Sequence, residues 1–248
     1  MFLICGRPVF AASKRVAMAC RGKAAKPAKP AKHMKQPFEP KNVAQKRLTT
    51  LLGDDGPTVV VVTGPAGCGK TFVAATMGAI ALVRGVVDRI VLCRPAVTAG
   101  EDHGYLPGNI NAKMAPWARP MTDAFKRYWT ADEIRKMVAD EVIELCPLAY
   151  CRGRTFERAW VLLDEASSCT PAQMRLMLTR VGEGSRMVVM GDLAQSDIGG
   201  INGLRDLEKR MRESGPADDM GAMAFDADDV VRHPVVAEVL RLYGDEQV

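Results

Sequence analysis

The chain has 248 residues, a length typical of one domain with short appendages; 48% of its residues are hydrophobic and 25% are charged. This composition excludes collagen-like and fully disordered chains, and no apolar run reaches the 18 or so residues of a membrane-spanning helix. The formal net charge of +5 indicates an acidic partner without naming one.

Residues 1–37 are predicted to form a basic, low-complexity, disordered tail. The first 35 residues contain nine Lys or Arg and no acidic residue, with an Ala/Lys/Pro repeat at 24–32 that buries too little apolar surface to offset ordering. Two interpretations stay open: a physiological start at Met18 or Met34, and a non-specific phosphate-binding arm. Residues 38–248 are predicted to be a single, mildly acidic domain.

The seven cysteines indicate a reducing compartment. Their number is odd and they include no CxxC pair, so a disulfide scaffold is not expected. Cys146 and Cys151 are close in sequence, but no histidine lies near them, which favours reduced core thiols over a zinc site. The apolar residues 1–5 precede the positive charges, so export is not predicted and the expected location is cytoplasmic.

From residue 38 onward, short β-branched runs alternate with helical patterns, which predicts an α/β fold with a mostly parallel sheet. The run 58–63 is nearly all apolar, as in a strand that is covered on both faces. A match to G-x-x-x-x-G-K-[ST] follows it and precedes a predicted helix over 71–84: Gly64, Pro65, Ala66, Gly67, Cys68, Gly69, Lys70 and Thr71. This context predicts a phosphate-binding loop rather than a glycine-rich turn without function.

The residue types in this loop suit phosphate chemistry. Glycines let backbone N–H groups face a phosphate without a Cβ in the way, and the helix N-terminus adds partial positive charge. Lys70 is predicted to reach the β- and γ-phosphates, and the Thr71 hydroxyl is predicted to hold Mg²⁺. Cys68 stands at a variable position and is interpreted as a tolerated small residue.

A second motif predicts the other metal contact and the group that activates water. Residues 159–163 form an apolar run that ends in Asp164 and Glu165, the Walker B pattern. Asp164 is predicted to bind Mg²⁺, and Glu165 to orient or deprotonate the attacking water.

The segment after this motif predicts a helix and then a strand. Residues 170–173 form a capping box, and the helical spacing of Met174, Met177, Leu178 and Val181 predicts a core-facing helix that stops at Gly182. A strand is predicted over 186–190. Gln195 follows this strand and is a candidate sensor of the γ-phosphate, the alternative being a polar loop residue.

Several stretches together resemble PhoH-like proteins, P-loop ATPases related to the superfamily 1 helicase core, over roughly residues 40–244. They are the phosphate loop 64–71, Arg94–Val97 with Gly100–Glu101 and Gly104–Gly108, Pro147–Phe156, Leu163–Ala166, Gly191–Gln195 and Asp229–Pro234. The resemblance implies a three-layer P-loop NTPase fold of the RecA-like type. It also implies binding of ATP with Mg²⁺, ATP hydrolysis, association with RNA or single-stranded nucleic acid, and a homo-oligomeric ring such as a hexamer.

The resemblance also assigns roles to residues outside these two motifs. Gln45 corresponds to the glutamine of the helicase Q-motif that reads adenine, the alternative being an exposed helix residue. Arg232 is a candidate for the γ-phosphate contact, in its own site or a neighbour's, in competition with Arg152 and Arg154. Arg94 is a candidate for contact with nucleic-acid phosphates.

Two functions remain open from the sequence. The first is an oligomeric ATPase that remodels RNA or a ribonucleoprotein; the second is a nucleotide-gated nucleic-acid-binding protein with little turnover. The residues after 196 are too few for a second RecA-like domain, so a processive monomeric helicase is not expected.

Overall fold

A computed structural model describes residues 38–95, 110–196, 201–215 and 217–230, with the backbone alone for 110–117. Six strands form one sheet in the order β3-β2-β4-β5-β1-β6. Their bounds are β1 (Val59–Thr63), β2 (Arg89–Arg94), β3 (Ile143–Pro147), β4 (Ala159–Leu163), β5 (Arg186–Gly191) and β6 (Met220–Ala224). All neighbouring strands pair in parallel, which confirms the predicted parallel sheet.

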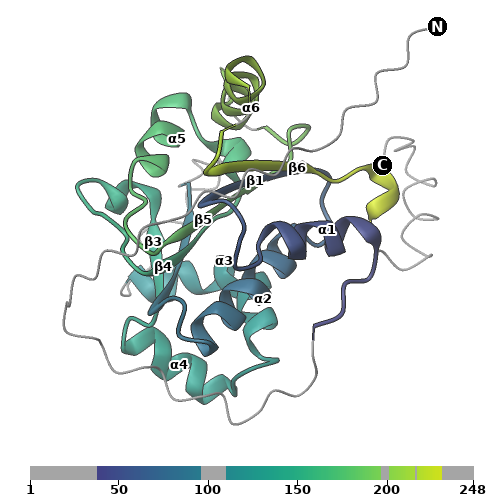
Figure 1. Ribbon diagram of the computed structural model, residues 1–248. Helices are drawn as coiled ribbons and strands as arrows, with labels where there is room; N and C mark the ends of the chain where they lie inside the picture. Colours follow the sequence, from purple (N-terminus) through teal and green to yellow (C-terminus); the bar gives the residue numbers. More distant parts are fainter. Residues whose placement is uncertain (1–37, 96–109, 197–200, 216, 231–248) are drawn as a thin grey trace, which may run out of the picture.

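Helices cover both faces of the sheet. The α-helices are α1 (Val43–Leu51), α2 (Lys70–Val83), α3 (Ile110–Phe125), α4 (Ala131–Ala139), α5 (Pro171–Leu178) and α6 (Gly203–Ser214). Three short 3₁₀ helices are η1 (Leu148–Cys151), η2 (Ala166–Ser168) and η3 (Ala227–Asp229). Figure 1 shows α1 to α4 on one side of the sheet and α5 and α6 on the other. No helix in these ranges is long and apolar enough to cross a membrane.

Alternation along the strands creates two hydrophobic cores. In β1, Val60 and Val62 pack in the cluster that contains buried residues of α1 to α4, whereas Val59 and Val61 pack in the cluster under α5 and α6. Successive strand side chains point to opposite faces, so an all-apolar run is what a strand between two helical layers requires. The three-layer α/β architecture is therefore confirmed.

The strand order places the two predicted motifs at one edge of the sheet. The phosphate loop follows β1 and the carboxylate pair follows β4, with β5 lying between these two strands. The carboxyl ends of parallel strands meet at the same edge, where open α/β sheets bind their ligands.

Helix α5 begins as predicted but ends four residues early. Thr170 and Gln173 form the capping box, Pro171 is in the first turn, and the predicted core residues Met174 and Met177 are buried. The helix ends at Leu178 instead of Gly182, because the following backbone pairs with another segment. The N–H of Phe156 donates to the Arg180 carbonyl and the N–H of Gly182 donates to the Phe156 carbonyl, both at 2.8 Å.

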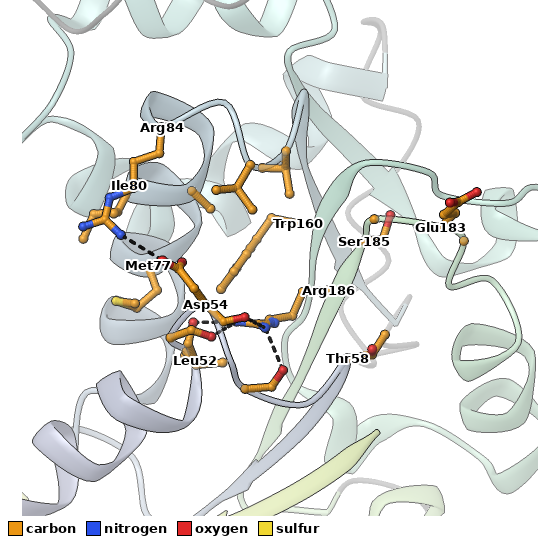
Figure 2. Close-up of a pocket in the computed structure, with 17 residues that line it drawn as sticks. Leu52, Asp54, Thr58, Met77, Ile80, Arg84, Trp160, Glu183, Ser185 and Arg186 are labelled. Carbon is orange, nitrogen blue, oxygen red and sulfur yellow. Dashed lines mark hydrogen bonds and ion pairs between the residues drawn. The ribbon is translucent and has the colours of Figure 1, made fainter. Parts of the chain in front are cut away.

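The opposite edge of the sheet has a cavity of about 650 Å³, lined by residues that precede or begin β1, β2, β4 and β5 and by residues of the second half of α2. Figure 2 shows Arg186 beside Trp160 on this cavity. The Arg186 guanidinium donates to the carbonyls of Leu52 at 2.7 Å and Gly53 at 2.6 Å, and burial lowers its pKa. Arg186 thus ties the start of β5 to the segment that leads into β1, away from the phosphate loop.

Gly78 in α2 is expected to resist replacement by alanine, although alanine favours an ordinary helix by about 1 kcal/mol. A Cβ at Gly78 would lie 2.6 Å from Trp160 Cδ1 and 2.8 Å from its Nε1. Because Trp160 is buried in the core, Gly78→Ala should lower the free energy of unfolding by about 1–3 kcal/mol, measured by urea denaturation. The loss should shrink in a Trp160→Phe background; an equal loss in both backgrounds would contradict this contact as its cause.

Candidate functional site

The phosphate loop lies between β1 and the N-terminus of α2, and at two of its glycines a Cβ would clash with another residue. Gly64 has φ of +140°, and a Cβ there would lie 2.6 Å from Phe225 Cβ. Gly69 has φ of +95°, and a Cβ there would lie 2.7 Å from Gln45 Nε2. Gly69 caps α2 without a side-chain hydrogen bond, so its first turn presents backbone N–H groups to a ligand.

Lys70 is buried at the base of this loop. Its ammonium donates to the carbonyl oxygens of Gly64 at 2.6 Å and Pro65 at 2.8 Å, and its Nζ lies 3.7 Å from Cys68 Sγ. The cation is therefore held by the loop that a phosphate would fill. Cys68 is fully buried, and burial raises the pKa of its thiol, which fits its interpretation as an unreactive small residue.

The two predicted Mg²⁺ ligands are in contact, although they are 93 residues apart in sequence. The Thr71 hydroxyl donates to Asp164 Oδ1 at 3.1 Å. Asp164 is only 9% exposed; this burial raises its carboxyl pKa, the negative charge of Glu165 adds to the rise, and the Thr71 hydrogen bond opposes it. A divalent cation would offset the cost of keeping this carboxylate ionised.

Glu165 lies beside Asp164 in a different environment. Its backbone is left-handed, with φ of 52°, a conformation that costs a residue other than glycine about 1–2 kcal/mol. Its side chain is 39% exposed, and its Oε1 lies 3.6 Å from an Nη of Arg94 at the end of β2. Sequence reasoning missed this ion pair, because the sequence named Arg94 only as a candidate for nucleic-acid phosphates and could not show that β2 neighbours β4.

Gln45 lies against the phosphate loop. It is buried, its amide donates to the Cys68 carbonyl at 3.0 Å, and its Oε1 accepts from the N–H of Lys41 at 2.9 Å. Asn42 caps the start of α1 and accepts from the Gln45 N–H at 2.8 Å. The alternative of an exposed helix residue is therefore wrong. Gln45 braces the loop from α1, and its contact with adenine stays a prediction.

The remaining candidates for γ-phosphate contact fall into three situations. Gln195 is exposed in the segment after β5, at the same edge of the sheet as the loop, and its sensing role stays a prediction. Arg232 lies outside the described residues. Arg154 donates two hydrogen bonds to Glu144, so its guanidinium already has a carboxylate partner. Arg152 is exposed.

The fold and this site define a class of protein. A glycine-rich loop with its lysine joins a buried strand to a helix, and a carboxylate pair ends another strand of the same parallel sheet. This is the three-layer P-loop NTPase fold of the RecA-like type, so nucleotide is the ligand class expected at this site. The chain belongs to the family described as PhoH-like protein, whose model matches residues 37–244.

Curated relatives share much of the sequence. A PhoH-like protein of Bacillus subtilis is 43% identical over 184 residues, and a PhoH-like protein of Mycobacterium tuberculosis is 42% identical over 209 residues. Protein PhoH of Escherichia coli K12 is 41% identical over 213 residues. These alignments cover 74%, 84% and 84% of this chain, and they span 57–58% of the length of the relatives.

Among solved structures, the large terminase of a thermophilic bacteriophage resembles this chain with a TM-score of 0.49 and 11% identity. The match covers 84% of this chain and 51% of the terminase. A likeness of this size says nothing about function.

Asp164→Asn is expected to stabilise the nucleotide-free protein by about 1 kcal/mol at pH 7, because it removes a buried negative charge from the site. The carboxyl pKa of Asp164 is raised above its usual value of 3.8. Ionisation of Asp164 therefore opposes folding as the pH rises from 3.8 through the raised pKa. The advantage of the variant should therefore be full at neutral pH and should fade as the pH falls through the raised pKa towards 3.8.

Urea denaturation at pH 7 and at acidic pH measures this difference in the free energy of unfolding. Asp55→Asn is the matched control, because Asp55 is exposed. An Asp164→Asn variant less stable than the wild type at pH 7 would contradict the electrostatic account.

Proposed function

We propose that this protein is a Mg²⁺-dependent ATP hydrolase. The observation that carries the proposal is the Thr71–Asp164 hydrogen bond, which joins the phosphate loop to the end of β4. It brings a hydroxyl and a carboxylate, whose oxygens are ligands that Mg²⁺ prefers, together beside the phosphate loop.

The donors fit ATP. Lys70 and the N–H groups of the first turn of α2 would bind the β- and γ-phosphates, while Thr71 and Asp164 would hold the cation. Bound Mg²⁺ would supply positive charge to the phosphate oxygens. Lys70 already lies within the loop and would exchange its carbonyl partners for phosphate oxygens.

The neighbouring carboxylates suit two roles. Asp164 is buried and hydrogen-bonded to Thr71, as a metal ligand is, whereas Glu165 is partly exposed and free of such a bond to the loop. Glu165 is therefore the group that orients water and accepts its proton. The left-handed backbone of Glu165 supports this assignment, since such strain concentrates at functional positions.

Phosphate release by the full chain tests the proposal. Release should require ATP and Mg²⁺, and it should stop when a chelator removes the cation. Release at background under all conditions, with and without RNA, would exclude an ATP hydrolase.

A second candidate is a nucleotide-gated nucleic-acid-binding protein with little turnover, and the Arg94–Glu165 ion pair favours it. A nucleic-acid phosphate that bound Arg94 would release Glu165, so strand binding and nucleotide chemistry would communicate through this pair. RNA retention at low and high salt, for the full chain and for a chain that begins at Met34, tests this candidate. Absent or salt-insensitive retention in both forms would contradict it.

We further propose that subunits form a homo-oligomeric ring, such as a hexamer, in which Arg232 contacts a neighbour's γ-phosphate and hydrolysis remodels RNA or a ribonucleoprotein. The family membership supports this proposal. Particle size with and without ATP and Mg²⁺ tests it, and a monomer in both conditions would contradict it. A cytoplasmic location is also a proposal, supported by five buried cysteines outside any disulfide among the described residues.

A further inference from the structure

Three buried cysteine thiols lie close together near the carboxyl ends of β2 and β3. Cys93 in β2 is the register partner of Cys146 in β3, and Cys151 ends η1. Cys151 Sγ lies 3.7 Å from Cys93 Sγ and 3.4 Å from Cys146 Sγ, and all three sulfurs lie within 4.8 Å of one another. The three side chains are 0–2% exposed, so the cluster is closed to solvent.

The separations fit ligands of one metal ion. Sulfurs in a disulfide lie about 2.05 Å apart, so these thiols are not bonded to each other. Two thiolates that bind one tetrahedral Zn²⁺ at about 2.3 Å lie roughly 3.8 Å from each other. The cluster therefore needs only small shifts of its side chains to surround an ion.

A neighbouring cation supports the thiolate form that metals bind. Arg154 Nη1 lies 3.4 Å from Cys146 Sγ, and Glu144 holds the guanidinium through a second hydrogen bond of 2.9 Å. Such a fixed outer partner orients a ligand and adjusts its basicity.

The donor set selects the class of metal. Sulfur is a soft ligand that favours Zn²⁺ and Cu⁺, whereas Mg²⁺ favours oxygen. Within the described residues, the three-cysteine cluster has no histidine or carboxylate ligand, so its chemistry differs from that of the Thr71–Asp164 pair. We propose that Cys93, Cys146 and Cys151 form a buried binding site for a thiophilic metal cation.

The cluster joins the ends of β2, β3 and η1 next to Asp164, the proposed Mg²⁺ ligand. The Cys93 carbonyl accepts the Asp164 N–H at 3.0 Å, and the next residue, Arg94, pairs with Glu165. A bound cation would lock this part of the sheet edge. Metal binding itself does not depend on ATP hydrolysis, so it can be tested separately.

The test titrates the reduced, metal-free full chain with Zn²⁺, Cu⁺ or Mg²⁺ in the presence of a competing chelator. Cys5→Ser and Cys20→Ser are present in every sample, so that thiols outside the described residues do not contribute. We expect one equivalent of Zn²⁺ or Cu⁺ per chain, no binding of Mg²⁺ to the cluster, and a higher thermal midpoint with the bound metal.

Cluster variants and a matched control locate the binding. Cys93→Ala, Cys146→Ala and Cys151→Ala should each weaken binding by about 100-fold or more, while Cys169→Ala, which removes another buried thiol, should leave it unchanged. No stoichiometric binding by the unaltered cluster, or binding by the three cluster variants as tight as that of the unaltered cluster, would overturn the proposal.

If the cluster variants fail to fold, a spectroscopic measurement on the unaltered protein tests the proposal instead. Co²⁺ bound to the unaltered cluster should give an intense sulfur-to-cobalt charge-transfer band whose intensity corresponds to three thiolates. A band that corresponds to one thiolate, or no band, would also overturn the proposal.

Discussion

Lys70→Ala is expected to weaken ATP binding by about 100-fold or more, equivalent to about 2.7 kcal/mol. The ammonium lies inside the phosphate loop, where it would make charge-assisted hydrogen bonds to phosphate, each worth about 1.5–3 kcal/mol. Stability should change by only about 1 kcal/mol, because Lys70 contacts two loop carbonyls that can accept from water instead. Binding of a fluorescent ATP analogue, together with urea denaturation, measures both effects.

Lys46→Ala is the matched control, because Lys46 is exposed on α1. It removes the same charge from the chain without touching the loop, so its ATP affinity should equal that of the wild type. An unchanged ATP affinity in Lys70→Ala would show that the nucleotide site has been placed incorrectly.

Glu165→Gln is expected to lower the rate of ATP hydrolysis by about 10²–10⁴-fold while leaving ATP affinity within a few-fold of the wild type. Glutamine keeps the size of the side chain but cannot accept a proton from water. Asp164, Thr71 and Lys70, the groups proposed to hold ATP and its cation, remain in place. Phosphate release at saturating ATP and an equilibrium binding measurement separate the two effects.

Glu157→Gln is the control for this change, since Glu157 is exposed before β4 and lies at the other end of that strand from Glu165. Its hydrolysis rate should match the wild type. Wild-type turnover in Glu165→Gln would exclude Glu165 as the general base and would leave Asp164 or another group in that role.

The sequence predicted much of the candidate nucleotide site because its two motifs are local. A run of valines, the glycine loop and the following helix are consecutive, so β1 and the start of α2 could be placed within one residue. The Asp164–Glu165 pair likewise follows its strand directly. The end of α5 could not be predicted, because the backbone of residues 180–182 forms hydrogen bonds with Phe156, a residue distant in sequence, instead of continuing the helix.

Contacts between distant segments required the tertiary structure. The Thr71–Asp164 hydrogen bond spans 93 residues, and the Arg94–Glu165 pair depends on β2 lying beside β4. The hydrogen bond from Gln45 to the Cys68 carbonyl depends on the packing of α1 against the phosphate loop. No sequence spacing predicts this contact.

The cysteines show most clearly the difference between local motifs, which the sequence predicts, and long-range contacts, which it does not. Sequence reasoning compared only Cys146 and Cys151, which are five positions apart, and favoured reduced thiols that fill a core. The parallel pairing of β2 with β3 adds Cys93, which is 58 positions from Cys151, and turns two neighbouring thiols into a three-sulfur cluster. The sequence by itself determined the phosphate loop and the carboxylate pair, because each is a continuous segment with its own chemistry. The sheet decided which segments meet, because strand order is set by packing of the whole domain.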